Sequence, residues 1–262
     1  MSRGMTIADL VQQVLYAVYK VRLDVSDSVE GSFHCKSDKF KEVVMEANFV
    51  LQELQKEQDW NFLRERWNIG PAHGHGMPQE VRIPDEVYKV CTGYGDAVRL
   101  HKGHHGHLIM QIPFEEARTG NRPRVDMFNE WGELNTVDRT QRAFIVGNTL
   151  VFSRPWRRAE DHGFLETDVI RYIEPLHICD DSCPDHCPKA YDDRILTWLP
   201  DPYYIVVRTA AKRAEADPAV SERVQSLTDE CTKLLSAMRE NDSAHTIPDA
   251  YDTAVLGYVP VL

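Results

Sequence analysis

Residues 144–155 carry the strongest local signal of the sequence and read Phe144-Ile-Val-Gly-Asn-Thr-Leu-Val-Phe-Ser-Arg-Pro155. Two short runs rich in β-branched and aromatic residues flank Gly147-Asn148, and the stretch ends at a proline. A Gly-Asn pair between such runs indicates a two-residue β-hairpin, because the primed turns need a positive φ at their centre. The hairpin lies in a β-rich middle that separates two helical parts of the chain, so it marks the fold class.

Short β-prone runs continue on both sides of this hairpin, where Gly and Pro are frequent and the helical period is absent. Eight such runs at this spacing predict a small antiparallel sandwich or a barrel-like sheet. The runs are Glu80–Ile83, Tyr88–Tyr94, Ala97–His101, Leu108–Ile112, Arg124–Phe128, Ala143–Val146, Thr149–Phe152 and Thr167–Ile173.

Two amphipathic helices are predicted before the β-rich middle. The first runs from about Thr6 to Lys20 with apolar residues at helical spacing, and Thr6 with Asp9 resembles a capping box. The second begins near Ser37 and is predicted to extend through an aromatic cluster to about Arg66.

Two further helices are predicted after it. Asp201-Pro202 and Asp217-Pro218 each place an N-capping residue before a proline, where the missing N–H is not needed. We expect helices over about 202–216 and from 218 to about 240, the second with apolar residues near a/d spacing that should contact a neighbouring helix.

The fold class follows from this order of elements. We predict an α+β protein: a helical bundle built from the N- and C-terminal helix pairs, with an inserted antiparallel β domain and an extended C-terminal tail. The predicted parts are N-terminal helices at 1–66, a β-rich insertion at 67–176, a Cys/His-rich connecting loop at 177–191, C-terminal helices at 192–240 and the tail at 241–262.

Composition and charge exclude several classes of protein. The chain has 262 residues, enough for one large or two small domains, and it contains no run of 18 apolar residues that would span a membrane. We also expect no signal peptide. The net charge of −11 argues against general binding to a nucleic-acid backbone. Local basic patches remain at Arg154, Arg157 and Arg158, and at Arg64 with Arg66.

One segment has the side chains of a metal site. His177, Cys179, Cys183 and Cys187 offer soft ligands for zinc, with cysteines at spacings of four. A bound metal ion would cross-link the loop at the point where the β part reconnects to the helices. The two-residue cysteine spacing of a zinc knuckle is absent, so an ordinary loop of reduced cysteines is the other interpretation, and we expect no cofactor.

Motifs of catalysis are missing from the sequence. There is no Gly-rich phosphate loop, no HExxH and no GxSxG, and no pattern places a nucleophile or base beside an orienting group. We therefore expect a non-enzymatic protein without catalytic or cofactor-binding residues; an enzyme with an unrecognised site is the weakest alternative.

Several weak motifs occur in a fixed order along the chain. The motifs are Gln58-Asp-Trp60-Asn-Phe62-Leu63, Ile83-Pro84-Asp85-Glu86-Val87, Phe114-Glu-Glu-Ala117, the Gly147-Asn148 hairpin ending at Pro155, Val169-Ile-Arg-Tyr172 and Pro202-Tyr-Tyr-Ile-Val-Val-Arg-Thr-Ala-Ala211. Their order and spacing resemble those of the head-to-tail adaptor, or connector, proteins of tailed bacteriophages. The resemblance covers roughly residues 5–240, and the Cys/His loop departs from it.

The resemblance implies a structural protein of the virion, made in the host cytoplasm and placed at the head-tail junction. Such proteins form rings, typically of twelve copies, that dock on the portal protein and link it to a downstream tail or nozzle protein. DNA would pass through the ring without specific binding, and no membrane is involved. The tail would reach into the portal through its apolar end, which comprises Val255, Leu256, Tyr258, Val259, Val261 and Leu262.

A second hypothesis follows from the Cys/His loop alone. In that case the chain is a zinc-stabilised intracellular regulator or binding module. Zinc analysis of the purified protein, together with its mass in solution, separates the two hypotheses.

Overall fold

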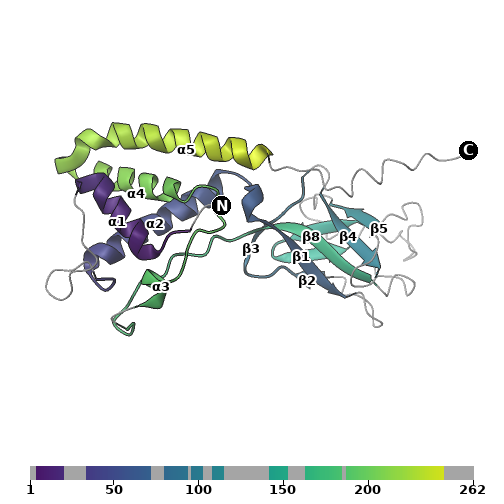
Figure 1. The fold of residues 1–262 in the computed structure, drawn as a ribbon. Helices are drawn as coiled ribbons and strands as arrows, with labels where there is room; N and C mark the ends of the chain where they lie inside the picture. Colours follow the sequence, from purple (N-terminus) through teal and green to yellow (C-terminus); the bar gives the residue numbers. More distant parts are fainter. Residues whose placement is uncertain are drawn as a thin grey trace, which may run out of the picture. The chain divides into compact units, whose positions relative to one another are not determined.

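The structure combines helices with antiparallel strands, as expected for an α+β protein (Figure 1). The chain divides into two compact units, one formed by Met1–Leu63 with Ile173–Leu262 and the other by Arg64–Tyr172. We call them the helical unit and the β unit. The computed structural model describes residues 4–20, 34–71, 80–93, 96–102, 108–114, 142–152, 163–184 and 187–244.

The first two helices begin where the capping signals predict. Helix α1 spans Ile7–Tyr19, and its capping box is present: the Thr6 side chain accepts a hydrogen bond from the Asp9 N–H, and the Asp9 carboxylate accepts one from the Thr6 N–H, both at 3.0 Å. Helix α2 spans Asp38–Glu57 and is capped by the Ser37 side chain. Each helix buries one apolar face.

The predicted end of the second helix near Arg66 is wrong. Helix α2 ends at Glu57, a short 3-10 helix η1 follows over Asn61–Leu63, and strand β1 begins at Arg64. Two contacts explain the early end. The buried Trp60 indole folds back and donates to the Leu54 carbonyl at 2.8 Å, and the Asp242 carboxylate accepts the N–H groups of the short helix.

The described residues that follow β8 form four helical segments. Helix α3 covers Pro188–Tyr191, inside the predicted connecting loop, and α4 covers Tyr203–Ala216. The Asp217-Pro218 signal begins the 3-10 helix η3, Pro218–Arg223, which leads into α5, Val224–Ala244, beyond the predicted end at 240. Helix α4 contacts α1, α2 and α5, and α5 runs alongside it (Figure 1).

The β unit contains two antiparallel sheets among its described strands. In one sheet the order is β1-β8-β4-β5, and β3 also pairs with β8; in the other it is β2-β7-β6. The bounds are β1 Arg64–Pro71, β2 Glu80–Arg82, β3 Val87–Val90, β4 Ala97–Lys102, β5 Leu108–Pro113, β6 Ala143–Val146, β7 Thr149–Phe152 and β8 Gly163–Arg171.

The hairpin predicted at Gly147-Asn148 joins β6 to β7. Val146 pairs with Thr149 across the turn, and Gly147 adopts a φ of +59°, which glycine reaches without steric cost. Apolar residues from both sheets, including Leu150 and Leu165, form one buried cluster. The two sheets therefore share a core, as a sandwich does.

Charged side chains line the other face of the larger sheet. Asp168 on β8 accepts from Arg64 at 2.9 Å and from Arg99 at 2.5 Å, and the nearly buried Glu166 lies 3.4 Å from Arg66. Arg64 and Arg66 are therefore paired with carboxylates of the sheet and do not form an isolated basic patch.

Some sequence predictions concern residues outside the described ranges. They are the strand at Arg124–Phe128, the basic patch at Arg154, Arg157 and Arg158, and the apolar tail that contains Val255, Leu256, Tyr258, Val259, Val261 and Leu262. Among the described helices, none has the length and apolar character needed to cross a bilayer.

Asp242 provides the test of how α2 ends. Asp242 is only 5% exposed, and its carboxylate accepts hydrogen bonds from the N–H groups of Asn61 at 3.1 Å and Phe62 at 3.2 Å. We expect Asp242→Ala to lower the free energy of unfolding by about 2 kcal/mol, because two partly buried N–H donors lose a charged acceptor. Urea unfolding followed by far-UV circular dichroism measures this.

Asp229→Ala is the matched control, because Asp229 is an exposed carboxylate on the same helix. Its effect should stay below about 0.5 kcal/mol. Equal effects of the two substitutions would show that Asp242 does not hold the end of α2.

Candidate metal centre

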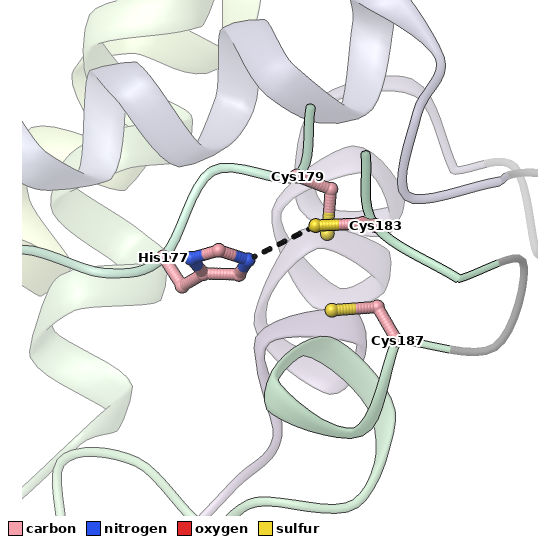
Figure 2. Close-up of side chains that lie close together, drawn as sticks. All are labelled: His177, Cys179, Cys183 and Cys187. Atoms are coloured by element: carbon pink, nitrogen blue, oxygen red, sulfur yellow. Dashed lines mark hydrogen bonds between the residues drawn. The ribbon is translucent and has the colours of Figure 1, made fainter. Parts of the chain in front are cut away.

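Four side chains predicted from the sequence meet at one point of the helical unit. The possible ligand atoms of His177, Cys179, Cys183 and Cys187 all lie within 4.8 Å of one another. Figure 2 shows the His177 ring directed toward Cys183, with its Nε2 atom 3.5 Å from the sulfur. Cys179 and Cys187 are buried, while His177 and Cys183 are partly exposed. The loop thus forms a cluster of one imidazole and three thiols.

Helix α2 holds the first part of this loop. The Asn48 side chain makes two hydrogen bonds to the backbone of Leu176, accepting from its N–H at 2.6 Å and donating to its carbonyl at 3.1 Å. Gln55, two turns further along the helix, accepts from the N–H of Ile173 at 2.6 Å. Because Leu176 directly precedes His177, these hydrogen bonds fix the position of the His177 backbone, from which the imidazole extends.

A local turn positions Cys183. The Asp180 carboxylate accepts from the Ser182 N–H at 2.9 Å, from the Ser182 hydroxyl at 2.6 Å and from the Cys183 N–H at 3.2 Å. The hydrogen bonds from Ser182 hold the pKa of the Asp180 carboxyl below its usual range. Such side-chain turns are what Asp favours in loops. The turn reverses the chain between Cys179 and Cys183, so both sulfurs can face one centre.

Helix α3 positions the last cysteine. Cys187 is the residue before the helix, and its carbonyl accepts the N–H groups of Ala190 at 2.9 Å and Tyr191 at 3.1 Å. Pro188 occupies the first helical turn, where it costs no hydrogen bond. Helix α3 contacts α1, so the fourth side chain is attached to the body of the helical unit.

The donor set and its spacing fit a metal ion such as zinc. Zinc–sulfur bonds are about 2.3 Å and zinc–nitrogen bonds about 2.0–2.1 Å, so a tetrahedral ion holds a nitrogen and a sulfur roughly 3.5 Å apart. The separation between His177 and Cys183 has this value. Burial raises the pKa of the Cys179 thiol, with hydrogen bonds to Cys35 and Cys187 adding to the shift. A bound metal would displace this proton, because the thiolate is the ligand.

Two neighbours of the cluster were not predicted. Cys35, which comes just before α2, is fully buried, and its thiol contributes to the raised pKa of the Cys179 thiol. The Tyr191 hydroxyl accepts from the Cys35 N–H at 3.0 Å. No spacing rule links Cys35 to a segment more than a hundred residues away, so only the tertiary structure reveals the contact.

Comparisons with known proteins do not assign a function to this cluster. No protein-family model matches the chain, and no curated protein matches it. The metal centre is therefore inferred from the donor set, its spacing and its burial.

The Asp180 turn gives a test that leaves all four candidate ligands in place. We expect Asp180→Ala to weaken Zn²⁺ affinity about tenfold, because the support that orients Cys183 is lost. Competition with a chromophoric chelator measures the affinity. Asp181→Ala is the control: it removes the same charge from the neighbouring exposed position and should leave the affinity unchanged. Equal losses would indicate a general effect of charge instead of the turn.

Proposed function

We propose that the chain is a non-enzymatic structural protein of a tailed-bacteriophage virion. In this proposal it forms a ring at the head-tail junction, docks on the portal protein and links it to a downstream tail or nozzle protein. The helical unit is a bundle that forms the ring body, and DNA passes through the ring without specific binding.

The arrangement of the chain in two units supports this proposal most. Helices α1 and α2 share a unit with α4 and α5, although residues 64–172 separate the two pairs in sequence. The helical unit is built from both ends of the chain, and the antiparallel β unit is inserted between them in sequence. This is the element order of the adaptor proteins that the sequence resembles.

Exposed apolar side chains also suit a subunit of a ring. Tyr16 on α1, Met45 and Phe49 on α2, and Tyr203 on α4 are each at least 40% exposed. Tyr16 and Tyr203 line one surface pocket together with Leu227 of α5. Large apolar residues at the surface often mark contacts with other proteins, and neighbouring copies of the chain would cover them.

The charge of the chain agrees with a channel for DNA. Each copy carries a net charge of −11, so a ring of about twelve copies would be strongly acidic. An acidic wall repels the DNA backbone and lets it pass. The apolar tail, outside the described residues, is proposed to bind the portal as an extended segment that orders on docking.

Assembly on the portal tests this proposal. We expect the chain to join rings of the portal protein encoded in the same genome, with a gain in mass of about one chain per portal subunit. Replacing Val255, Leu256, Tyr258 and Val259 by Ser should abolish the gain, because the docking segment loses its apolar contacts. Mass photometry measures the complexes.

The control variant changes polar residues of the same tail, Asp249→Asn with Asp252→Asn, and should still assemble. Free monomers without the portal agree with the proposal, since the portal can act as the template. A wild-type chain that stays monomeric beside intact portal rings would contradict it.

We also propose that His177, Cys179, Cys183 and Cys187 bind one structural zinc ion. The ion would supply a rigid cross-link that joins the loop to α3, and no catalytic role is assigned to it. The same cluster favours a second candidate function, a zinc-stabilised binding module. One zinc per chain, in a protein that does not bind the portal, would support this second function.

Metal removal tests the zinc proposal. We expect one zinc per chain by mass spectrometry of the metal, and none after chelation or in Cys183→Ser. At a free zinc concentration of a hundred times Kd, zinc binding raises the free energy of unfolding by about 2.7 kcal/mol. Chelation should therefore lower the Tm of the helical unit by roughly 5–10 °C. Cys91→Ser, in the β unit, should keep its zinc. A chain that unfolds identically with and without zinc would refute the structural role.

A further inference from the structure

A groove opens on the surface of the helical unit where α1, the start of α4, η3 and α5 meet. Tyr16 of α1 and Tyr203 of α4, which are 43% and 40% exposed, line it together with the buried Leu227 of α5. Its volume is about 610 Å³, within the range of roughly 300–1,000 Å³ that is typical of binding pockets. The described part of the chain therefore presents a concave surface with exposed aromatic rings.

Hydrogen bonds to the end of α1 fix one wall of the groove. The Arg223 guanidinium, at the end of η3, donates to the carbonyls of Ala17 at 3.2 Å and Val18 at 2.7 Å. Carbonyls in the last turn of a helix have no partner within the helix, so a cation there satisfies them and suits the helix dipole. The Lys20 ammonium lies 5.3 Å from the centre of the Tyr16 ring. The groove is thus preformed by the packing of α1 against η3 and α5.

The charged residues of the groove carry an excess of positive charge. Lys20 and Arg223 line it together with one carboxylate, that of Glu230. Two cations and one anion therefore meet here, although the chain as a whole carries −11. A segment that binds in this groove should combine apolar side chains with negative charge.

The C-terminal tail, residues 245–262, has this combination. It contains Asp249 and Asp252 and neither lysine nor arginine. Its aromatic and aliphatic side chains are suited to cover exposed rings, and its charge is opposite to that of the groove. These apolar residues are Val255, Leu256, Tyr258, Val259, Val261 and Leu262.

The tail starts close enough to reach the groove of its own chain. Helix α5 ends at Ala244, and Glu230 and Leu227 lie fourteen and seventeen positions earlier, which is about 21–26 Å along a helix. Val255 follows Ala244 by eleven positions, and an extended chain of that length spans about 36–40 Å. The apolar part of the tail can therefore return along α5 to the groove of the same molecule.

We propose that the tail, residues 245–262, binds the groove of its own chain. Its apolar side chains cover Tyr16 and Tyr203, and the cations of the groove attract its two aspartates. The inference goes beyond the virion role proposed above, because it concerns the free chain and needs no portal. In an assembled ring, docking of the tail on the portal would free the groove for a neighbouring copy.

Hydrogen exchange of the full-length chain, followed by mass spectrometry, tests this inference because a bound segment exchanges more slowly than a free one. We expect the amides of residues 253–262 to exchange about tenfold more slowly than those of a synthetic peptide of the same sequence. Tyr16→Ala with Tyr203→Ala should raise their exchange to the rate of the peptide. Met45→Ala with Phe49→Ala, which removes exposed apolar side chains of α2 outside the groove, should leave the tail as protected as in the wild type.

The charge of the groove gives a second readout. Lys20→Glu should reduce the protection of the tail about threefold, and added salt should reduce it in the wild type, because the attraction of the aspartates is lost or screened. Lys56→Glu is the matched control, because Lys56 is an exposed lysine of α2 outside the groove. It should protect the tail as the wild type does.

Three outcomes would overturn the proposal. Tail amides of the wild type could exchange as fast as the free peptide, or the two double variants could protect the tail equally. Protection that disappears on hundredfold dilution would place the tail in the groove of a second copy. The amides of α1 and α4 should exchange alike in all variants, which excludes unfolding as the cause. If the double tyrosine variant does unfold, the comparison of Lys20→Glu with Lys56→Glu decides.

Discussion

Burial of helix α4 is the constraint on which the helical unit depends. Its buried residues include Ile205, Val206 and Val207 in succession, so apolar side chains leave the helix in several directions. A helix of this kind needs partners on more than one side. Helices α1 and α2 supply them from one end of the chain and α5 from the other. Residues 64–172 are thereby left as a separate unit with a core of its own.

The same constraint brings the candidate metal centre together. After β8 the chain returns to the helical unit along α2, where Gln55 and Asn48 bind the backbone of the returning segment. That path brings α3, which directly follows the Cys/His loop, beside the start of α2, where the Cys35 N–H donates to the Tyr191 hydroxyl. The loop contains few apolar residues, so hydrogen bonds to α2 and the Asp180 turn hold it in place of a hydrophobic core. Its four candidate ligand side chains lie close enough together to hold a metal ion.

Sequence reasoning succeeded where neighbouring residues decide the conformation. The Thr6 capping box and the Gly147 turn were confirmed, because each depends on hydrogen bonds or a backbone angle within a few residues. It failed at the end of α2, where the helical pattern continued into the aromatic cluster. Trp60 and Asp242 end the helix there, and Asp242 comes from the opposite end of the chain. Strand β1 was not predicted, because residues 64–66 were assigned to the helix. Its pairing with β8, which begins at Arg64, joins residues about a hundred positions apart.

The sequence by itself determined the four longer helices apart from the end of α2, most of the strands and the four candidate ligands, because periodicity, turn chemistry and close spacing are local properties. His177 and Cys187 lie near each other along the chain, so a single loop can gather all four side chains. Only the tertiary structure decided the bounds of the two units, the end of α2 and the position of Cys35. Each of these depends on contacts between residues far apart in the chain, such as those of Asp242 with Asn61 and of Cys35 with Tyr191.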